Sequence, residues 1–186
     1  MTQMVVVVAS ATGRTRLLAD ALAEGAREAG ADVEVVAAEE VDAAALEAAD
    51  VIVLGSGVHM GGLESSMSTF LERTAPQWMQ GKLIDKIGAA FVSAGAGGRG
   101  GGELALITLH AALAEHGVVT IPMSNRTEGF AHGGCHWGPL AWSNPRSGKA
   151  GPTQQHLASA RAHGQRVAEC AARWLRGLPG GPDLPD

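Results

Sequence analysis

A regular alternation of strand-like and helix-like stretches is the sequence feature that most constrains the fold. Five short runs rich in Val, Ile and Ala predict strands. Most of them lack the every-other-residue pattern of a half-exposed strand, so we expect them to be buried on both faces. The expected strands are residues 4–9, 32–37, 50–55, 86–93 and 118–122. Apolar residues recur at helical spacing between and after these runs. The expected helices are residues 16–29, 41–49, 63–74, 103–116 and 153–175.

This alternation predicts an α/β fold in which a five-stranded parallel sheet carries helices on both faces. Right-handed crossovers leave few topologies, and the order 2-1-3-4-5 brings the carboxyl ends of the first, third and fourth strands together. The 186 residues suffice for one full-sized core. No repeat or linker divides the chain. We therefore expect one domain over residues 1–176 and a disordered Gly/Pro-rich tail over residues 177–186.

The loop between the first strand and the first helix has the composition of a phosphate site. Backbone N–H groups at the amino end of a helix favour an anion, and the loop adds three hydroxyls, one glycine and one arginine. Its residues are Ser10, Ala11, Thr12, Gly13, Arg14 and Thr15. The single glycine does not fit a dinucleotide fingerprint, and no lysine precedes Lys82, which excludes a nucleoside-triphosphate loop. A terminal phosphate monoester fits better, and the alternative is an ordinary N-capping turn.

Two glycine-rich loops should lie beside the first one, because they follow the third and fourth strands. They span residues 55–62 and 93–102. Together the three loops predict a slot for a flat heterocycle, contacted through exposed backbone. His59 is the side chain of the second loop that we expect to touch the ligand. The alternative is that both glycine-rich segments are simple surface turns.

Other chemistry-bearing residues give weaker signals. His132, Cys135 and His136 lack the fourth ligand and the spacing of a zinc site, so no metal is expected. Trp137 and Trp142 either pack or form a rim for a planar substrate. No nucleophile–base arrangement stands out.

Composition excludes several partners. The net charge of −5 argues against nucleic acid, and no apolar run is long enough to span a membrane. Neither a signal peptide nor a disulfide framework is expected, because the amino-terminal run lacks a basic flank and the chain has only two cysteines. A cytoplasmic protein is the expectation.

The three loops resemble those of flavodoxin-like flavoproteins, and more specifically the WrbA-type NAD(P)H:quinone oxidoreductases. Residues 10–15 match the Ser/Thr-x-Thr-Gly-x-Thr signature for the FMN phosphate. Matches to the WrbA type continue in order along nearly the whole chain. They are residues 55–62, 67–71, 78–83, 93–98, 113–117, 133–138 and 160–164. This chain differs in having His59, Met60 and Gly62 where that family has Arg, Phe and Asn, and in lacking its insertion after the second strand.

The resemblance implies a three-layer flavodoxin-like sandwich and an FMN-dependent enzyme. A nicotinamide, NADH or NADPH, would pass a hydride to flavin N5, and two electrons would go on to a quinone-like or aromatic acceptor. Residues 10–15 would hold the phosphate. The isoalloxazine and ribityl groups would contact two further sets of residues, which are Gly57, Val58, His59, Met60, Gly61 and Gly62, and Ser93, Ala94, Gly95, Ala96, Gly97 and Gly98.

The resemblance also implies that His116 lines the flavin pocket and that Trp78 approaches it from a neighbouring subunit of a homodimer or homotetramer. Considered alone, His116 more simply satisfies a helix dipole. A helix carboxyl end lies at the amino edge of the next strand. His116 is therefore expected to reach a flavin only across an interface, unless the helix is shorter than predicted. A flavodoxin-type electron carrier and a specialised flavoenzyme acting on an aromatic metabolite remain the alternative functions.

Overall fold

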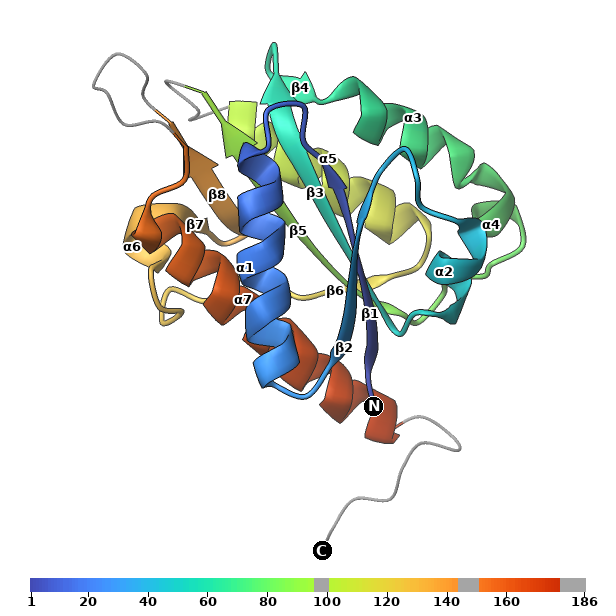
Figure 1. Cartoon of the computed structure of the whole chain (residues 1–186). Coiled ribbons are helices and arrows are strands. Elements are labelled where there is room, and N and C mark those ends of the chain that lie inside the picture. The colour runs from blue at the N-terminus through green and yellow to red at the C-terminus, as the bar shows by residue number, and fades with distance from the viewer. Residues whose placement is uncertain (96–100, 144–150, 178–186) are drawn as a thin grey trace, which may run out of the picture.

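The computed structural model describes residues 1–95, 101–143 and 151–177, and in it a mostly parallel sheet lies between two layers of helices (Figure 1). The main path of the sheet runs β2-β1-β3-β5-β8-β7, with β4 paired to β3 and β6 paired to β5. The strands are β1 (Gln3–Ala9), β2 (Asp32–Ala37), β3 (Val51–His59), β4 (Gly62–Leu63), β5 (Ile87–Ala94), β6 (Val119–Thr120), β7 (Gly134–Cys135) and β8 (Gly138–Trp142). The predicted α/β fold class and the order of the first four strand positions are confirmed.

The fifth strand position is divided between two segments, which the sequence did not predict. β6 pairs with the start of β5 through Val119 and Thr120, whereas β8 pairs with its end through Leu140, Ala141 and Trp142. The prediction of one strand over residues 118–122 followed by irregular chain was therefore wrong in its extent. The intervening residues form the short helix α6 (Phe130–Gly133) and the strand β7 at the edge of the sheet.

The alternation of side chains along β1 explains the two hydrophobic cores. Val6 and Val8 belong to the core under α1 and α7, whereas Val5 and Val7 belong to the core under α2, α3 and α5. These strand residues are buried on both sides of the sheet, as the Val-rich pattern predicted. The helices are α1 (Arg14–Glu28), α2 (Ala43–Ala48), α3 (Ser65–Arg73), α4 (Ala75–Met79), α5 (Gly101–Glu115) and α7 (Gln154–Gly177).

Two glycines allow α1 and α7 to pack backbone against backbone. A Cβ on Gly25 would overlap the carbonyl oxygen of Arg161, and a Cβ on Gly164 would overlap the carbonyl oxygen of Leu22. Each helix therefore presents a glycine to the backbone of the other. This close approach fixes α7 against α1, the helix that begins at the predicted phosphate loop.

The last helix begins at a pair of reciprocal hydrogen bonds between Thr153 and His156. Thr153 accepts a hydrogen bond from the N–H of His156 through Oγ1 at 3.3 Å, and His156 Nδ1 accepts one from the N–H of Thr153 at 3.0 Å. This reciprocal pair satisfies two N–H groups at the start of α7. The helix continues to Gly177, one residue into the predicted tail, and residues 178–186 lie outside the described part of the chain.

Within the described ranges, no helix combines the length and the apolar character that crossing a membrane requires.

Candidate functional site

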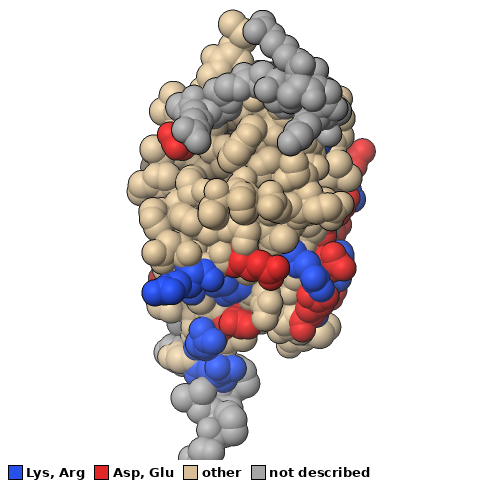
Figure 2. Space-filling view, turned by 90° about the vertical axis from the view of Figure 1, so that its left-hand side faces the viewer, with Lys and Arg blue, Asp and Glu red and all other residues tan. Residues whose placement is uncertain are grey.

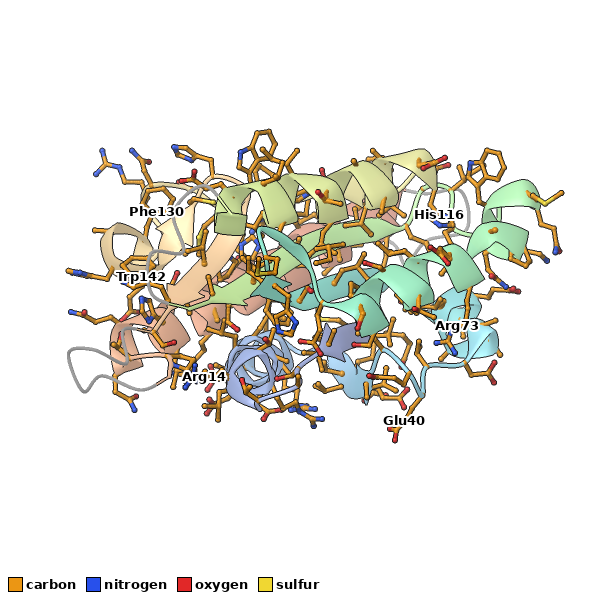
Figure 3. All side chains as sticks on the ribbon, turned by 90° about the horizontal axis from the view of Figure 1, so that it is seen from above. Arg14, Glu40, Arg73, His116, Phe130 and Trp142 are labelled. Atoms are coloured by element: carbon orange, nitrogen blue, oxygen red, sulfur yellow. The ribbon has the colours of Figure 1, made fainter. Side chains whose placement is uncertain are left out.

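Side chains from three segments, namely α1, β5 and the residue after β8, meet at the carboxyl edge of the sheet beside the first loop. Thr15, buried at the start of α1, shares a hydrogen bond with Ser93 of β5, with 2.7 Å between the two hydroxyl oxygens. Arg14 donates through its guanidinium to Ser143 Oγ, just after β8, at 3.1 Å. Figure 3, viewed onto this edge, shows Arg14 beside the first turn of α1 and Trp142 on the same side of the molecule. The start of α1 is thereby tied to β5 and to the residue that follows β8.

The loop itself presents its donors to solvent. Ala11, Thr12 and Gly13 are exposed, and Gly13 caps α1 in the left-handed region at φ 78°. Ser10 Oγ accepts the N–H of Arg16 at 3.1 Å, which orders the turn. The first N–H groups of a helix have no acceptor within the helix. The exposed turn and the adjoining start of α1 therefore form a concentrated set of N–H and hydroxyl donors.

The second loop is a β-hairpin rather than the irregular loop that the sequence predicted. β3 continues to His59, and Val58 and His59 pair with Leu63 and Gly62 of β4. Met60 and Gly61 form the turn with φ of 49° and 84°, so both adopt the left-handed conformation of a tight hairpin turn. The Met60 side chain is fully exposed at the tip. The predicted residues 57–62 are therefore rigidly placed beside the first loop.

One residue of the site was missed by sequence reasoning. The carboxylate of Glu64, only 6% exposed, accepts the N–H of Ala11 through Oε2 at 3.2 Å. Its Oε1 accepts from Ser66 Oγ at 3.3 Å, and Oε2 lies 3.8 Å from Nε2 of the half-exposed His59. No periodicity in the sequence signals a contact between residues 53 positions apart. An acidic side chain from the start of α3 therefore contacts the predicted phosphate loop.

The third loop is described only at its start. Ser93 and Ala94 end β5 and Gly95 follows them, whereas the predicted cofactor residues Ala96, Gly97 and Gly98 lie outside the described residues. After that gap the chain resumes close to the hairpin, because a Cβ on Gly101 would lie 3.4 Å from Gly61 Cα. The first turn of α5 thus borders the same edge of the sheet.

His116 and Trp78 lie at the opposite edge from the first loop. Thr74 Oγ1 donates its only hydrogen to the carbonyl of Leu71 at 2.7 Å, so it must accept from His116 Nε2, which is 2.9 Å away. Nε2 of the ring therefore carries a proton, and burial lowers the pKa of His116, which favours the neutral ring. Figure 3 shows His116 across the molecule from Arg14.

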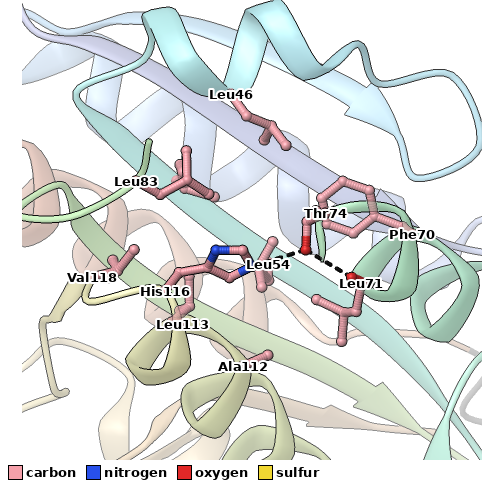
Figure 4. Close-up of a pocket in the computed structure, with 11 residues that line it drawn as sticks. Leu46, Leu54, Phe70, Leu71, Thr74, Leu83, Ala112, Leu113, His116 and Val118 are labelled. Atoms are coloured by element: carbon pink, nitrogen blue, oxygen red, sulfur yellow. Dashed lines mark hydrogen bonds between the residues drawn. The ribbon is translucent and has the colours of Figure 1, made fainter. Parts of the chain in front are cut away.

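The surroundings of His116 are apolar (Figure 4). Leu54, Phe70 and Leu113 are among the residues that line a cavity of about 20 Å³ beside its ring, which is room for about one water molecule. In one chain, this cavity is far too small for a quinone. His116 directly follows α5, which agrees with the alternative that it interacts with the dipole at the carboxyl end of that helix. Trp78, on α4, is half-exposed.

The remaining candidates take part in packing. Trp142 meets His156 edge to face, with ring centroids 4.7 Å apart, and the Trp137 carbonyl lies 2.6 Å from Nε2 of the buried His110. Burial raises the pKa of the Cys135 thiol, which keeps it protonated. No three His, Cys, Asp or Glu residues are arranged to hold a metal ion in the part of the chain that the structure describes.

The family model for flavodoxin matches residues 6–164. The chain belongs to the flavodoxin family. An NAD(P)H dehydrogenase (quinone) of Brucella ovis is 33% identical over 198 residues, covering 93% of this chain and 98% of the relative. Among solved structures, a flavodoxin, WrbA-like protein from Agrobacterium tumefaciens is 28% identical, with a TM-score of 0.74 over 93% of this chain and 99% of that one. A flavodoxin from the domain Archaea, 23% identical with a TM-score of 0.68, has the same fold.

Proposed function

We propose that this flavodoxin-family chain is an FMN-dependent oxidoreductase that takes electrons from NADH or NADPH and reduces a quinone-like acceptor. The observation that carries the proposal is the loop of residues 10–13, which lies between β1 and α1 at the carboxyl edge of the sheet and is exposed at Ala11, Thr12 and Gly13. The substrate class follows from the full-length similarity to NAD(P)H dehydrogenase (quinone) proteins, because 93% of this chain aligns with 98% of that relative.

The donor set of the first loop fits a terminal phosphate. Ser10 and Thr12 supply hydroxyls on the loop, Gly13 adopts the left-handed conformation, and the start of α1 adds N–H groups that have no acceptor within the helix. The carboxylate of Glu64 accepts the N–H of Ala11 in this loop, which supports the assignment because an anionic oxygen fits the same donor. Arg14 adds a positive charge at the start of α1, where a hydrogen bond to Ser143 holds its guanidinium in place. We infer that residues 10–15 hold the FMN phosphate.

The hairpin and the end of β5 would border the flavin ring and the ribityl chain. The turn at Met60 and Gly61 is fixed by the β3–β4 pairing, and Ser93 is tied to Thr15. Their exposed backbone would orient the cofactor with little loss of conformational freedom. FMN, when bound, supplies the hydride acceptance and the two-electron reduction of the acceptor, and the protein supplies binding and orientation.

We propose that His116 and Trp78 act at the flavin of a second copy of the chain. Within one chain they lie at the far edge of the sheet, so this role requires a homodimer or homotetramer. Exposed large apolar side chains support association, because contact between copies would remove them from water. They are Trp78, Leu104, Ile107 and Trp137, all more than 40% exposed. Figure 2 shows the edge over α6 and β7, where most of the Lys, Arg, Asp and Glu side chains lie in the lower part and few lie above it.

The proposed function is tested by steady-state turnover of the FMN-loaded chain with NADH or NADPH and a benzoquinone. We expect quinone-dependent oxidation of the nicotinamide, and flavin-free protein serves as the control. No turnover together with a stable one-electron form during reductive titration would contradict the enzyme and support an electron carrier. Light scattering in the same buffer tests the oligomer, and a monomer at micromolar concentration would remove the role given to His116 and Trp78.

A further inference from the structure

The Glu64 side chain is held against the first loop by the fold of its own segment. Glu64 directly precedes α3, and its own N–H is bonded to Gly57 O at 3.1 Å and to Ser56 Oγ at 3.0 Å. These bonds anchor the backbone of Glu64 to the end of β3. The side chain then extends to the first loop, where Oε2 accepts the N–H of Ala11.

The space for this carboxylate is created by the absence of a side chain at Gly57. A Cβ on Gly57 would lie 2.7 Å from Glu64 Oε2 and 3.6 Å from Thr15 Oγ1. Almost any other residue at position 57 would therefore push the carboxylate away from the loop. Gly57 and Glu64 thus act together to place an anion beside the loop.

The Glu64 carboxylate and a phosphate monoester would compete for the same position beside the first loop. Both are anionic and both accept N–H bonds, and the Ala11 N–H is one of the donors that a phosphate in this loop would use. Two anions at contact distance in a largely buried position repel strongly. In the part of the chain that the structure describes, the Glu64 carboxylate accepts no hydrogen bond from a basic side chain. His59 lies 3.8 Å away and is half-exposed, and the Arg14 guanidinium is held by Ser143.

We propose that Glu64 is a built-in competitor for the cofactor phosphate. In the flavin-free protein its carboxylate occupies part of the phosphate position, and FMN enters fully only after that carboxylate moves out toward His59 and solvent. Glu64 thereby lowers the affinity for the phosphate part of the cofactor and leaves the contacts of the flavin ring unchanged. This inference rests on the proposed FMN site, and it concerns the selectivity of that site for FMN over riboflavin, which lacks the phosphate.

The test compares FMN and riboflavin binding to the flavin-free, full-length chain by fluorescence titration. Glu64→Ala removes both the charge and the bulk, whereas Glu64→Gln removes the charge and keeps the shape. Glu72→Gln is the matched control, because it removes the same charge from an exposed position on the same helix. Melting temperatures establish that each variant is folded.

We expect Glu64→Ala to bind FMN about tenfold more tightly or better, since one charge-assisted hydrogen bond no longer has to be displaced. Glu64→Gln should lie between Glu64→Ala and the wild type. Riboflavin affinity should stay within about threefold in every variant, and Glu72→Gln should match the wild type.

An unchanged ratio of FMN to riboflavin affinity in Glu64→Ala would overturn the inference while leaving the FMN site intact. Weaker FMN binding by Glu64→Ala would overturn it as well, since the carboxylate would then be helping to hold the cofactor. Failure of the wild type and all variants to bind either flavin would instead refute the proposed function, and the inference with it.

Discussion

Replacing Gly164 by alanine tests how closely α7 packs against α1. The added Cβ would overlap the carbonyl oxygen of Leu22 well inside 3.0 Å, a separation that real Cβ atoms essentially never show. The obstructing atom belongs to the backbone and cannot rotate away, so the two helices must separate by about 1 Å, an overpacking that costs about 3 kcal/mol. Alanine recovers about 1 kcal/mol of helix propensity, so we expect a net loss of about 2 kcal/mol. For a chain of this size that loss lowers Tm by about 4–8 °C.

The assay is thermal unfolding followed by circular dichroism, with Gly177→Ala as the matched control. Gly177 is the last residue of the same helix, and a Cβ there meets no atom within 4 Å. Gly177→Ala should therefore keep or slightly raise Tm. Equal melting temperatures for Gly164→Ala and Gly177→Ala would refute the close packing of α1 and α7.

Three further predictions concern the loop, the buried histidine and the far edge of the sheet. Thr12→Val should weaken FMN binding by about ten- to a hundredfold through the loss of one hydrogen bond to a charged group, while Tm stays the same. If a fluorescence titration gives the wild-type affinity, the phosphate does not bind at Thr12. Burial lowers the pKa of His163 from 6.5 to about 3, so the stability that its neutral ring contributes is present above pH 6.5 and is lost as the pH falls toward 3. Between pH 6 and 4 the unfolding free energy of His163→Gln should therefore fall less steeply than that of the wild type, by about 1.4 kcal/mol per pH unit. Urea titrations that give the same pH dependence for both proteins would contradict this. In the FMN-saturated oligomer, His116→Ala should reduce quinone turnover about tenfold or more. A lower Tm with unchanged turnover would mean that His116 only stabilises the fold through its contact with Thr74.

The strands that the sequence predicted well are those whose pattern is local. β1, β2 and β5 match their predicted ranges within one residue at either end, because a Val- or Ala-rich run buried on both faces carries its signal within itself. β8 was missed because its residues 138–142 begin with Gly and Pro, which argue against a strand. It forms because Leu140 pairs with Val92 of β5. That pairing is set by the fold rather than by the local sequence.

The site shows the same division between local and long-range information. The first loop was recognisable because its hydroxyls and glycine are contiguous between a strand and a helix. The hairpin at residues 58–63 was not, since Met60 adopts a left-handed conformation without the Asn-Gly or Asp-Gly signature of such turns. The contact between Glu64 and the first loop could not be predicted, because its partner Ala11 is 53 residues away in the sequence. The location of His116 at the far edge agrees with the geometric argument from the end of its helix.

The central claim is that the loop at residues 10–15 holds the phosphate of FMN. The most direct measurement is to reconstitute the flavin-free chain with equimolar FMN and FAD, remove unbound flavin, and identify the retained cofactor by mass spectrometry and visible spectrum. A loop that encloses a terminal phosphate, without the glycine fingerprint for a pyrophosphate, predicts that FMN is retained. Retention of FAD alone, or of no flavin, would contradict the account.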